Sequence, residues 1–318
     1  MSFKYSEIFS KIGAGILSVF VLFNFSSCSQ TTKELPVNIE EVHITVPGME
    51  GEVKLAYLSD LHIVTMSDEI IESYRENAKE RLNSMSYKGV SAADQLPGWI
   101  DTLNSTGADY VLFGGDMVDF PSKANIDHLK SGIEKLNIPY MYVRADHDLA
   151  PIFMDGTSSL TCAEYQETID ELSDVYVQEF PDFCIVGWNN STSLLTVSGI
   201  EKIREAKDLG KPMILLTHVP IAPLNDDSLA EKCEEEYNGR AIIWGLYTGY
   251  GYYPNDTPEG EATAELLNML YSDDSPFVEV LCGHLHFSWD GYISEHVHQH
   301  VFSAAFNRYM GVITVSGS

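Results

Sequence analysis

The chain has 318 residues, of which 44% are hydrophobic and 11% aromatic, so it can bury a sizeable core and is not an intrinsically disordered protein. Its 19 Lys and Arg residues against 47 Asp and Glu residues leave a formal net charge of −28. Proteins bind nucleic acids and anionic lipids largely through Lys and Arg, so this charge argues against a nucleic-acid-binding protein and against a domain adsorbed on a membrane.

Residues 1–27 are predicted to be a secretory signal peptide. Lys4 and Lys11 precede an apolar run over residues 12–25, and a short basic region before such a run is typical of a secretory signal. A membrane-spanning helix needs roughly 20 apolar residues, which is more than this run offers. A buried or spanning helix remains the alternative interpretation.

The end of this segment resembles the lipobox of bacterial lipoproteins. Cys28 follows two small residues, although Phe25 stands where an aliphatic residue is usual. The resemblance implies that Cys28 is lipidated and that the protein is exported and anchored at the cell envelope, in the periplasm or on the outer surface. We expect residues 28–40 to be a tether, so that the protein meets the membrane only through its lipid. A signal peptide without lipidation is the alternative.

Residues 41–318 are predicted to form a single α/β domain, because short apolar runs alternate with segments of helical period and no internal repeat interrupts them. Strands are expected at residues 53–59, 110–113, 139–143, 183–187, 194–197, 213–216, 278–282 and 311–315. Helices are expected at residues 68–86, 91–106, 125–136 (with Asn125 as its cap), 198–208 and 261–271. The polar, acidic segment 223–262 is expected to be a long loop.

Four cysteines remain beyond Cys28. An exported chain permits disulfides, and four cysteines allow three complete pairings that the sequence does not separate. Buried thiols are the other interpretation. These residues are Cys162, Cys184, Cys233 and Cys282.

Five of the apolar runs end in side chains that can bind a metal ion. In open α/β sheets, ligand sites form in the crevice beyond the carboxyl ends of the strands. Five such endings are unlikely to arise by chance, and they predict a metal site at one edge of the sheet. The residues are Asp60 and His62, Asp116, Asp146 and His147, His218, and His284 with His286.

The order and approximate spacing of these groups resemble the motifs of the calcineurin-like metallophosphoesterases over about residues 53–300. The family motifs are Asp-x-His, Gly-Asp-x-x-Asp, Gly-Asn-His-Asp, a lone His and Gly-His-x-His. The chain has Asp60-Leu-His62, Gly115-Asp116-Met-Val-Asp119, Ala145-Asp146-His147-Asp148, His218 and Gly283-His284-Leu-His286. The resemblance implies a four-layer α/β fold, with two mixed sheets packed face to face and flanked by helices.

The resemblance also implies a centre of two divalent or trivalent metal ions that activates water to hydrolyse a small phosphomonoester or phosphodiester. Two adjacent ions screen the charge of the phosphate, and mixed N and O ligands suit Mn, Fe or Zn. Asp116 would bridge the ions. The remaining ligands would be Asp60, His62 and His286 for one ion, and Asp146, His218 and His284 for the other. His147 would assist the leaving group, and Asp119 and Asp148 would orient the histidines.

The third motif departs from the family pattern, because Ala145-Asp146-His147 stands where Gly-Asn-His is usual. An Asp can bind a metal, but it cannot donate the amide N–H that an Asn offers to a substrate oxygen. Its extra negative charge is expected to weaken the binding of a phosphate. The alternative function is therefore a catalytically weak or inactive metal-binding surface protein that retains the fold.

Three residues are candidates to line a substrate cleft. Tyr247 and Tyr250 lie among glycines and other aromatic residues, a composition that suits a loop beside a flat leaving group, although such a loop can also pack on itself. Arg308 is the third candidate, with a surface or packing role as the alternative. The pattern of His296, His298 and His300 predicts one face of a strand.

Overall fold

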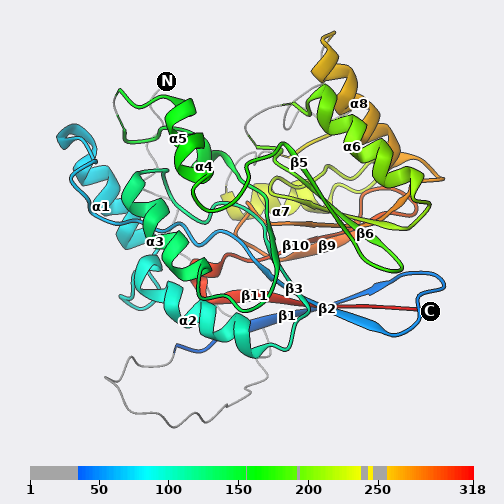
Figure 1. Ribbon diagram of the computed structural model, residues 1–318, viewed down its shortest axis with the longest axis horizontal. Coiled ribbons are helices and arrows are strands. Elements are labelled where there is room, and N and C mark those ends of the chain that lie inside the picture. Colours follow the sequence, from blue (N-terminus) through cyan, green and yellow to red (C-terminus); the bar gives the residue numbers. More distant parts are fainter. Residues whose placement is uncertain (1–34, 155, 192–193, 238–242, 246–255) are drawn as a thin grey trace.

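The computed structural model describes residues 35–154, 156–191, 194–237, 243–245 and 256–318. Its strands form two mixed sheets packed against each other, with helices on the outer face of each (Figure 1). The predicted four-layer α/β sandwich is confirmed.

The first sheet has five strands in the order β1-β11-β2-β3-β4. Only the pairing of β11 with β2 is antiparallel. The strands are β1 (Asn38–Thr45), β2 (Glu52–Leu58), β3 (Tyr110–Phe113), β4 (Tyr140–Tyr142) and β11 (Tyr309–Ser316).

The second sheet has six strands in the order β5-β6-β7-β8-β10-β9. Its central strands are parallel, and the antiparallel pairs lie at its two edges. The strands are β5 (Val175–Glu179), β6 (Cys184–Trp188), β7 (Met213–Thr217), β8 (Phe277–Cys282), β9 (Trp289–Tyr292) and β10 (His298–Val301).

The helices form the outer layers. Apolar residues of α2 and α3 pack on the first sheet, and those of α6 and α8 pack on the second (Figure 1). The helices are η1 (Glu72–Tyr74), α1 (Arg75–Ser84), α2 (Ala92–Ser105), α3 (Lys123–Ile133), α4 (Asp146–Leu149), α5 (Ser159–Gln166), α6 (Val197–Asp208), α7 (Ser228–Tyr237), α8 (Pro258–Tyr271) and η2 (Ala305–Asn307).

A third apolar cluster fills the space between the two sheets. Alternate residues of β2 and of β7 point into it from opposite sides, among them Leu55 and Leu216. The Tyr57 ring stacks on Phe302 with a centroid distance of 4.0 Å, which joins the sheets next to the strand ends. Trp188, at the end of β6, is fully buried on the other face of its sheet, as expected for a core residue. This double-faced burial holds the strand ends in fixed positions.

Several element predictions are wrong. Residues 194–196 are not a strand, because the Thr196 side chain accepts from the Gly199 N–H and caps α6. Ser122 caps α3 in place of Asn125, which is buried and donates to the Phe120 carbonyl. The expected long loop contains α7 and the start of α8. The edge strand β5 was not predicted.

The structure describes only the C-terminal part of the expected tether, from residue 35 on. The strand β1 begins at Asn38, inside the predicted range 28–40, because it pairs with β11 through its whole length. Cys28 and the signal segment 1–27 lie outside the described residues. No helix in the described part of the chain is long and apolar enough to cross a membrane. The four other cysteines are buried free thiols.

Candidate metal centre

Backbone hydrogen bonds bring the loops after four strands together. The Asp60 N–H donates to the Gly115 carbonyl at 2.9 Å, and the His62 N–H donates to the Asp116 carbonyl at 2.9 Å. These bonds join the loop after β2 to the loop after β3. The Gly283 N–H donates to the His218 carbonyl at 3.1 Å and joins the loops after β8 and β7. The predicted meeting of these strand ends is therefore observed.

Five of the predicted ligands have a left-handed backbone. Non-glycine residues rarely adopt a positive φ, which costs on the order of 1–3 kcal/mol each and is most often found at functional sites. The φ angles are 53° for Asp60, 52° for His62, 53° for Asp116, 71° for His284 and 57° for His286. Strain shared by five chemically matched side chains indicates a site that was selected for its chemistry and not for stability alone.

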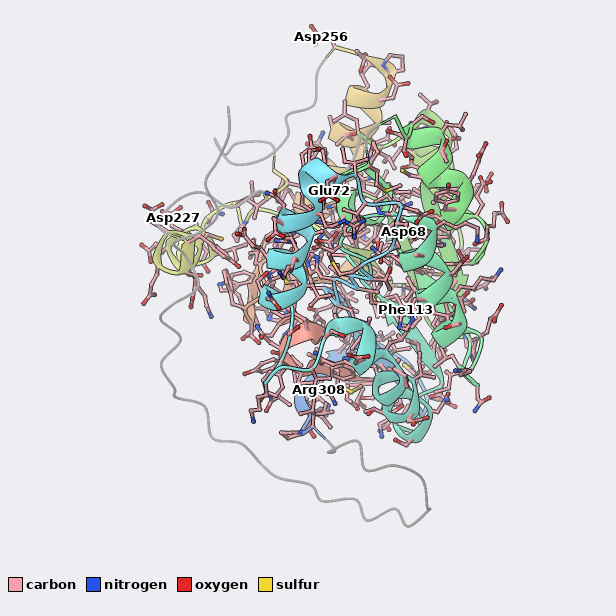
Figure 2. All side chains as sticks on the ribbon, turned by 90° about the vertical axis from the view of Figure 1, so that its left-hand side faces the viewer. Asp68, Glu72, Phe113, Asp227, Asp256 and Arg308 are labelled. Atoms are coloured by element: carbon pink, nitrogen blue, oxygen red, sulfur yellow. The ribbon has the colours of Figure 1, made fainter. Side chains whose placement is uncertain are left out.

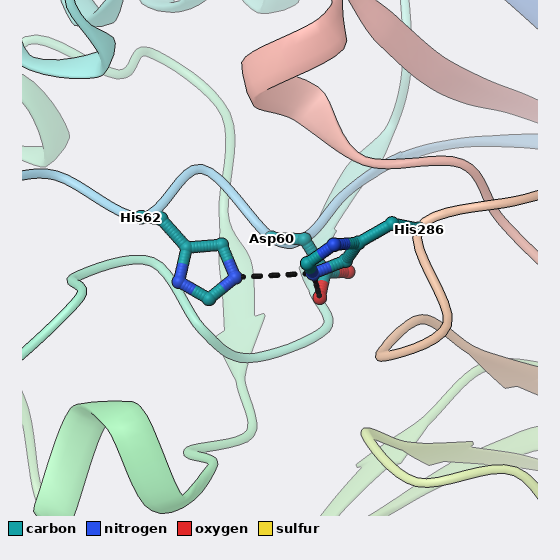
Figure 3. Close-up of side chains that lie close together, drawn as sticks. All are labelled: Asp60, His62 and His286. Atoms are coloured by element: carbon teal, nitrogen blue, oxygen red, sulfur yellow. Dashed lines mark hydrogen bonds and ion pairs between the residues drawn. The ribbon is translucent and has the colours of Figure 1, made fainter. Parts of the chain in front are cut away.

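Asp60, His62 and His286 form the first group of donors (Figure 3). The two Nε2 atoms of the histidines are 3.2 Å apart, and His286 Nε2 lies 3.3 Å from Asp60 Oδ1. Asp60 and His62 are buried, while His286 is partly exposed. The Phe306 ring packs edge-on against both histidines and forms an apolar wall beside them.

Asp116, His218 and His284 form the second group. The His218 Nδ1–H donates to the Gly114 carbonyl at 2.8 Å, which leaves Nε2 directed at Asp116, 3.2 Å from Oδ2. Asp116 Oδ1 and His218 Nε2 are both buried without a well-aligned hydrogen-bond partner among the described residues. Buried polar atoms normally have partners. Two orphaned donor atoms on adjacent N and O ligands fit a metal ion.

His147 joins the two groups. Its donor atom lies within 4.8 Å of those of His62 and Asp116, and its ring contacts the His62 ring edge-on. His147 Nδ1 is 2.7 Å from the Asp119 carbonyl oxygen, an acceptor that requires a proton on this nitrogen. The other nitrogen, Nε2, is therefore the one available to the centre.

Burial and charge give the histidines different protonation states. Burial lowers the pKa of His62 to about 4, and burial together with the charge of His218 lowers the pKa of His284 to about 3. Burial would also lower the pKa of His218, but the charge of Asp116 outweighs it and raises that pKa to about 10. A metal ion needs the deprotonated nitrogen, so binding at His218 should release a proton and strengthen as the pH rises.

The carboxylates of the centre are held ionised. Burial would raise the pKa of Asp60, but its bond to His286 and the charge of His218 lower it to about 2. Burial is likewise outweighed at Asp116, whose pKa lies well below its usual range because of the charges of His218 and His147. The site therefore offers charged oxygen ligands at neutral pH.

Asp119 forms a hydrogen bond with His62, as predicted for a carboxylate that orients a histidine. Its Oδ1 is 3.0 Å from His62 Nδ1 and it is fully buried. Arg81 of α1 donates to both carboxylate oxygens, with Nη2 at 2.5 Å and Nε at 3.0 Å. Arg81 was not predicted from the sequence, because it lies in a polar helix far from every motif and only the ion pair identifies it.

Asp148 has a different role from the one predicted. Among the described residues, its carboxylate makes no hydrogen bond or ion pair with a histidine. Its carboxylate accepts hydrogen bonds from the Tyr142 hydroxyl, at 2.7 Å, and from backbone N–H groups of the loop after β3 and of Ala145, at 2.8–3.2 Å. Burial and the charge of Asp116 raise the pKa of Asp148 to about 6. Asp148 therefore shapes the loop that carries Asp116.

Asp146 begins α4 next to His147 and is partly exposed. Its carboxylate belongs to none of the groups of three donors within 4.8 Å of one another in the described part of the chain. Burial and the charge of Asp116 raise the pKa of Asp146. The other six predicted ligands all belong to these groups, whereas Asp146 lies next to them without joining one.

Gly283 allows a close approach of two loops in the centre. A Cβ atom at this position would lie 2.4 Å from both Asp60 Oδ2 and Ser59 Oγ, a distance that real Cβ contacts do not reach. The His284 N–H, next in the chain, donates to Asp60 Oδ1 at 3.1 Å. The glycine of the Gly-His-x-His motif is therefore explained by the space that Asp60 occupies.

Arg308 is not available to a substrate, which corrects its assignment to the cleft. Its guanidinium lies 4.1 Å from the centroid of the Trp99 ring and donates to the carbonyls of Leu35 and Pro36. The residue is 4% exposed and lies beside α2 (Figure 2). The other two predicted cleft residues, Tyr247 and Tyr250, lie outside the described residues.

Of the three histidines predicted to share one face of a strand, His298 and His300 lie on β10 as predicted, whereas His296 does not. His298 Nδ1 is 3.0 Å from Glu279 Oε1, and the His300 ring packs on Phe302. His296 precedes β10 and is exposed near two exposed carboxylates. Exposed acidic groups of this kind are common on protein surfaces and add nothing to the centre.

Removing metal is expected to destabilise the protein. Ligands that bind only the folded state stabilise it by about 2.7 kcal/mol at 100 times Kd, and for a domain of this size each kcal/mol shifts Tm by roughly 2–4 °C. We expect chelation by EDTA to lower Tm by about 5 °C or more. Differential scanning fluorimetry before chelation, after it and after addition of Mn²⁺ or Zn²⁺ measures this. An unchanged Tm throughout would contradict metal binding at the centre.

Comparison with known proteins gives one family. A family model described as calcineurin-like phosphoesterase matches residues 53–245. The chain is similar to the solved structure of a dimetal phosphatase from Danio rerio, with 13% identity, 80% of this chain and 88% of that chain covered, and a TM-score of 0.46. It is also similar to a purple acid phosphatase from seeds of yellow lupin (Lupinus luteus), with 11% identity, coverage of 80% and 44%, and a TM-score of 0.46. No curated protein sequence matches the chain.

Proposed function

The chain belongs to the calcineurin-like phosphoesterase family, and we propose that it is an exported hydrolase that uses two metal ions to activate water and cleave a small phosphomonoester or phosphodiester. One observation carries this proposal. Two groups of buried and partly buried N and O donors lie side by side, with Asp116 of one group 3.6 Å from His62 of the other, and Asp116 Oδ1 and His218 Nε2 are left without well-aligned hydrogen-bond partners among the described residues.

The donor groups divide between the two proposed metal positions. Asp60, His62 and His286 would hold one ion. His218 and His284, completed by Asp146, would hold the other, and Asp116 would be shared between them. When bound, the two metal ions would screen the phosphate charge and lower the pKa of a bound water molecule. The N and O donor set suits Mn, Fe or Zn.

His147 is suited to assist the leaving group. Burial would lower the pKa of His147, but the charges of Asp116, Asp119 and Asp146 raise it above its usual value. Its Nδ1 is fixed at the Asp119 carbonyl oxygen, 2.7 Å away. A protonated imidazole with one nitrogen anchored can hold a proton on Nε2 and give it to a departing alkoxide.

The charge of the chain favours a small substrate. The net charge of −28 repels long polyanions at a distance. Two bound cations would attract a small phosphoester locally, within about a Debye length of 8 Å at physiological ionic strength.

Export and lipidation are proposed from the sequence before residue 41. The basic start, the short apolar run and Cys28 support a lipoprotein held at the cell envelope. Labelling of cells with an alkyne-tagged palmitate should mark the full chain and not the Cys28→Ser variant. Equal labelling of both chains would contradict lipidation at Cys28.

A panel of substrates tests the activity. The full-length chain is first freed of metal and then supplied with Mn²⁺, Zn²⁺ or Fe²⁺, and its metal content is measured by plasma mass spectrometry. Hydrolysis of p-nitrophenyl phosphate would indicate a monoesterase, and hydrolysis of bis-p-nitrophenyl phosphate a diesterase. Failure to retain metal would overturn the proposed centre.

The second candidate function is a metal-binding surface protein with weak or no turnover. One observation favours it: Asp146 adds a carboxylate beside Asp116, where the family motif has a neutral Asn. Two bound metal ions per chain with no hydrolysis of any phosphoester would support this function and contradict the first.

We expect Asp146→Asn to raise kcat/KM for small aryl phosphates by about tenfold, which corresponds to about 1.4 kcal/mol. The substitution removes one negative charge beside the phosphate and adds an N–H donor, while the amide oxygen can still bind metal. Steady-state kinetics of the metal-loaded variant measure the change. Asp127→Asn, an exposed substitution on α3, is the control. An unchanged or lower kcat/KM in metal-loaded Asp146→Asn would contradict this account.

A further inference from the structure

We propose that Arg81 is a positioning residue that couples the docking of helix α1 to metal binding. It would act by fixing Asp119, and through Asp119 the two histidines His62 and His147. This inference rests on the proposed metal centre and goes beyond the motifs, none of which includes α1. In Figure 2, α1 lies across the face of the domain turned to the viewer, below Glu72.

Arg81 binds both carboxylate oxygens of Asp119 with the Nε–Nη2 edge of its guanidinium. Nη2 donates to Oδ1 at 2.5 Å, and Nε donates to Oδ2 at 3.0 Å. Asp119 is fully buried, and the Arg81 side chain is 25% exposed. A bidentate pair with one buried partner holds its geometry better than an exposed ion pair does. The carboxylate of Asp119 is therefore fixed in one orientation.

Asp119 in turn fixes both histidines. Its Oδ1, which Arg81 grips, is 3.0 Å from His62 Nδ1. Its backbone carbonyl oxygen is 2.7 Å from His147 Nδ1. Partners of this kind set which nitrogen of a histidine carries the proton and which faces the metal, and their loss typically weakens metal affinity about 10–100-fold. Arg81 is thus one contact away from a proposed metal ligand.

The same ion pair is one of the contacts that hold α1 in place. Ala78 is the one fully buried residue of α1, and Leu82 is partly buried against the cluster around Phe120. Because apolar packing supplies most helix stability in proteins and α1 has little of it, the bond to the buried Asp119 matters more for the position of this helix. Because metal favours the ordered His62–Asp119 pair, metal should also favour docked α1, and by linkage docked α1 should favour metal.

The chain offers a matched control on the same helix. Arg75 lies at the start of α1, and its side chain is 32% exposed. Its acidic partner is Glu72, which is 92% exposed. Arg75→Met therefore removes the same charge from the same helix without touching the centre. Arg81→Lys keeps the charge at position 81 but loses the fork that spans both oxygens.

The test measures metal affinity of the full chain by competition with a chromophoric chelator, using Zn²⁺ or Mn²⁺ alone. We expect Arg81→Met to weaken the affinity about tenfold, at the lower end of the range for such partners. Arg81→Lys should recover part of the loss, and Arg75→Met should match the wild type. Equal affinities for all four chains would overturn the proposal.

Hydrogen exchange of residues 75–84 supplies a readout that a purely structural role would not move. Metal should slow exchange of this segment in the wild type and in Arg75→Met, and have less effect in Arg81→Met. If Arg81→Met only lowers Tm while metal still protects α1 as in the wild type, Arg81 merely anchors the helix and the proposal fails. Neither measurement uses hydrolysis, so a chain that binds metal without turnover would refute the proposed activity and leave this test intact.

Discussion

Replacing Asp116 by Asn is expected to lower kcat/KM by about 1,000-fold or more, beyond the 10–100-fold typical for partners that only orient a ligand. The metal content should fall below two ions per chain. Asp116 belongs to the second donor group and also approaches His62 of the first. Its Oδ2 lies 3.2 Å from His218 Nε2 and 3.6 Å from His62 Nε2.

The physical reason is the negative charge that Asp116 would place between two bound cations. Two ions at the separation of a dinuclear site, about 3.5–4 Å, repel each other strongly, and a shared carboxylate reduces this repulsion. An Asn keeps one oxygen of similar size but loses the negative charge. It also turns an N–H group toward one of the two metal positions, since the amide has only one acceptor atom.

Kinetics with the metal-loaded chain and plasma mass spectrometry measure the two effects together. Asp109→Asn is the control, because Asp109 precedes the same strand β3 at its opposite end and accepts the Lys54 N–H at 2.8 Å. It should leave both metal content and kcat/KM near the wild type. A variant Asp116→Asn that still binds two ions and turns over normally would refute a bridging role.

The layout of the centre followed from the sequence because its donors come directly after short, apolar strands. Tyr110–Phe113 is buried throughout, and Asp116 follows it at the strand end. Buried runs of this kind are recognised from a few residues, and chain order then places their ends together. The same reasoning failed for β5, an edge strand in which only Val175 is buried.

Residues that act through tertiary contacts could not be predicted in this way. Arg81 has no motif, and its role depends on a carboxylate 38 residues away. Arg308 was predicted to line the substrate cleft, but its guanidinium packs on Trp99, which is distant in sequence. Asp148 follows His147 in a motif, yet its acceptors face the backbone of another loop. Each outcome depends on which element packs nearby, and that information is not local.

Asp148→Ala is expected to give the largest loss of stability, about 5 kcal/mol, at about 1 kcal/mol for each buried group left without an acceptor. The carboxylate accepts from four backbone N–H groups, those of Asp116, Met117, Val118 and Ala145. It also accepts from the Tyr142 hydroxyl, and it is fully buried.

Among the described residues of the centre, no other side chain accepts hydrogen bonds from so many different groups. With Ala at 148, the buried N–H groups of the loop that carries Asp116 would lose their acceptor. They would then have to bind water inside the protein, or the loop would adopt another conformation. Either change would release the left-handed backbone of Asp116, with its φ of 53°. We therefore expect a weaker metal affinity to accompany the lower stability, because a positive φ persists only where the surroundings enforce it.

Urea unfolding of the metal-free chain measures the stability without the contribution of bound ions. Asp109→Ala serves as the comparison, since that exposed carboxylate accepts one backbone N–H, and it should lose no more than about 1 kcal/mol. Asp148→Asn should fall between the two, because its amide oxygen still accepts while its NH₂ faces other donors. If Asp148→Ala and Asp109→Ala shift the urea midpoint equally, the loop after β3 is held by its own backbone and Asp148 does not shape it.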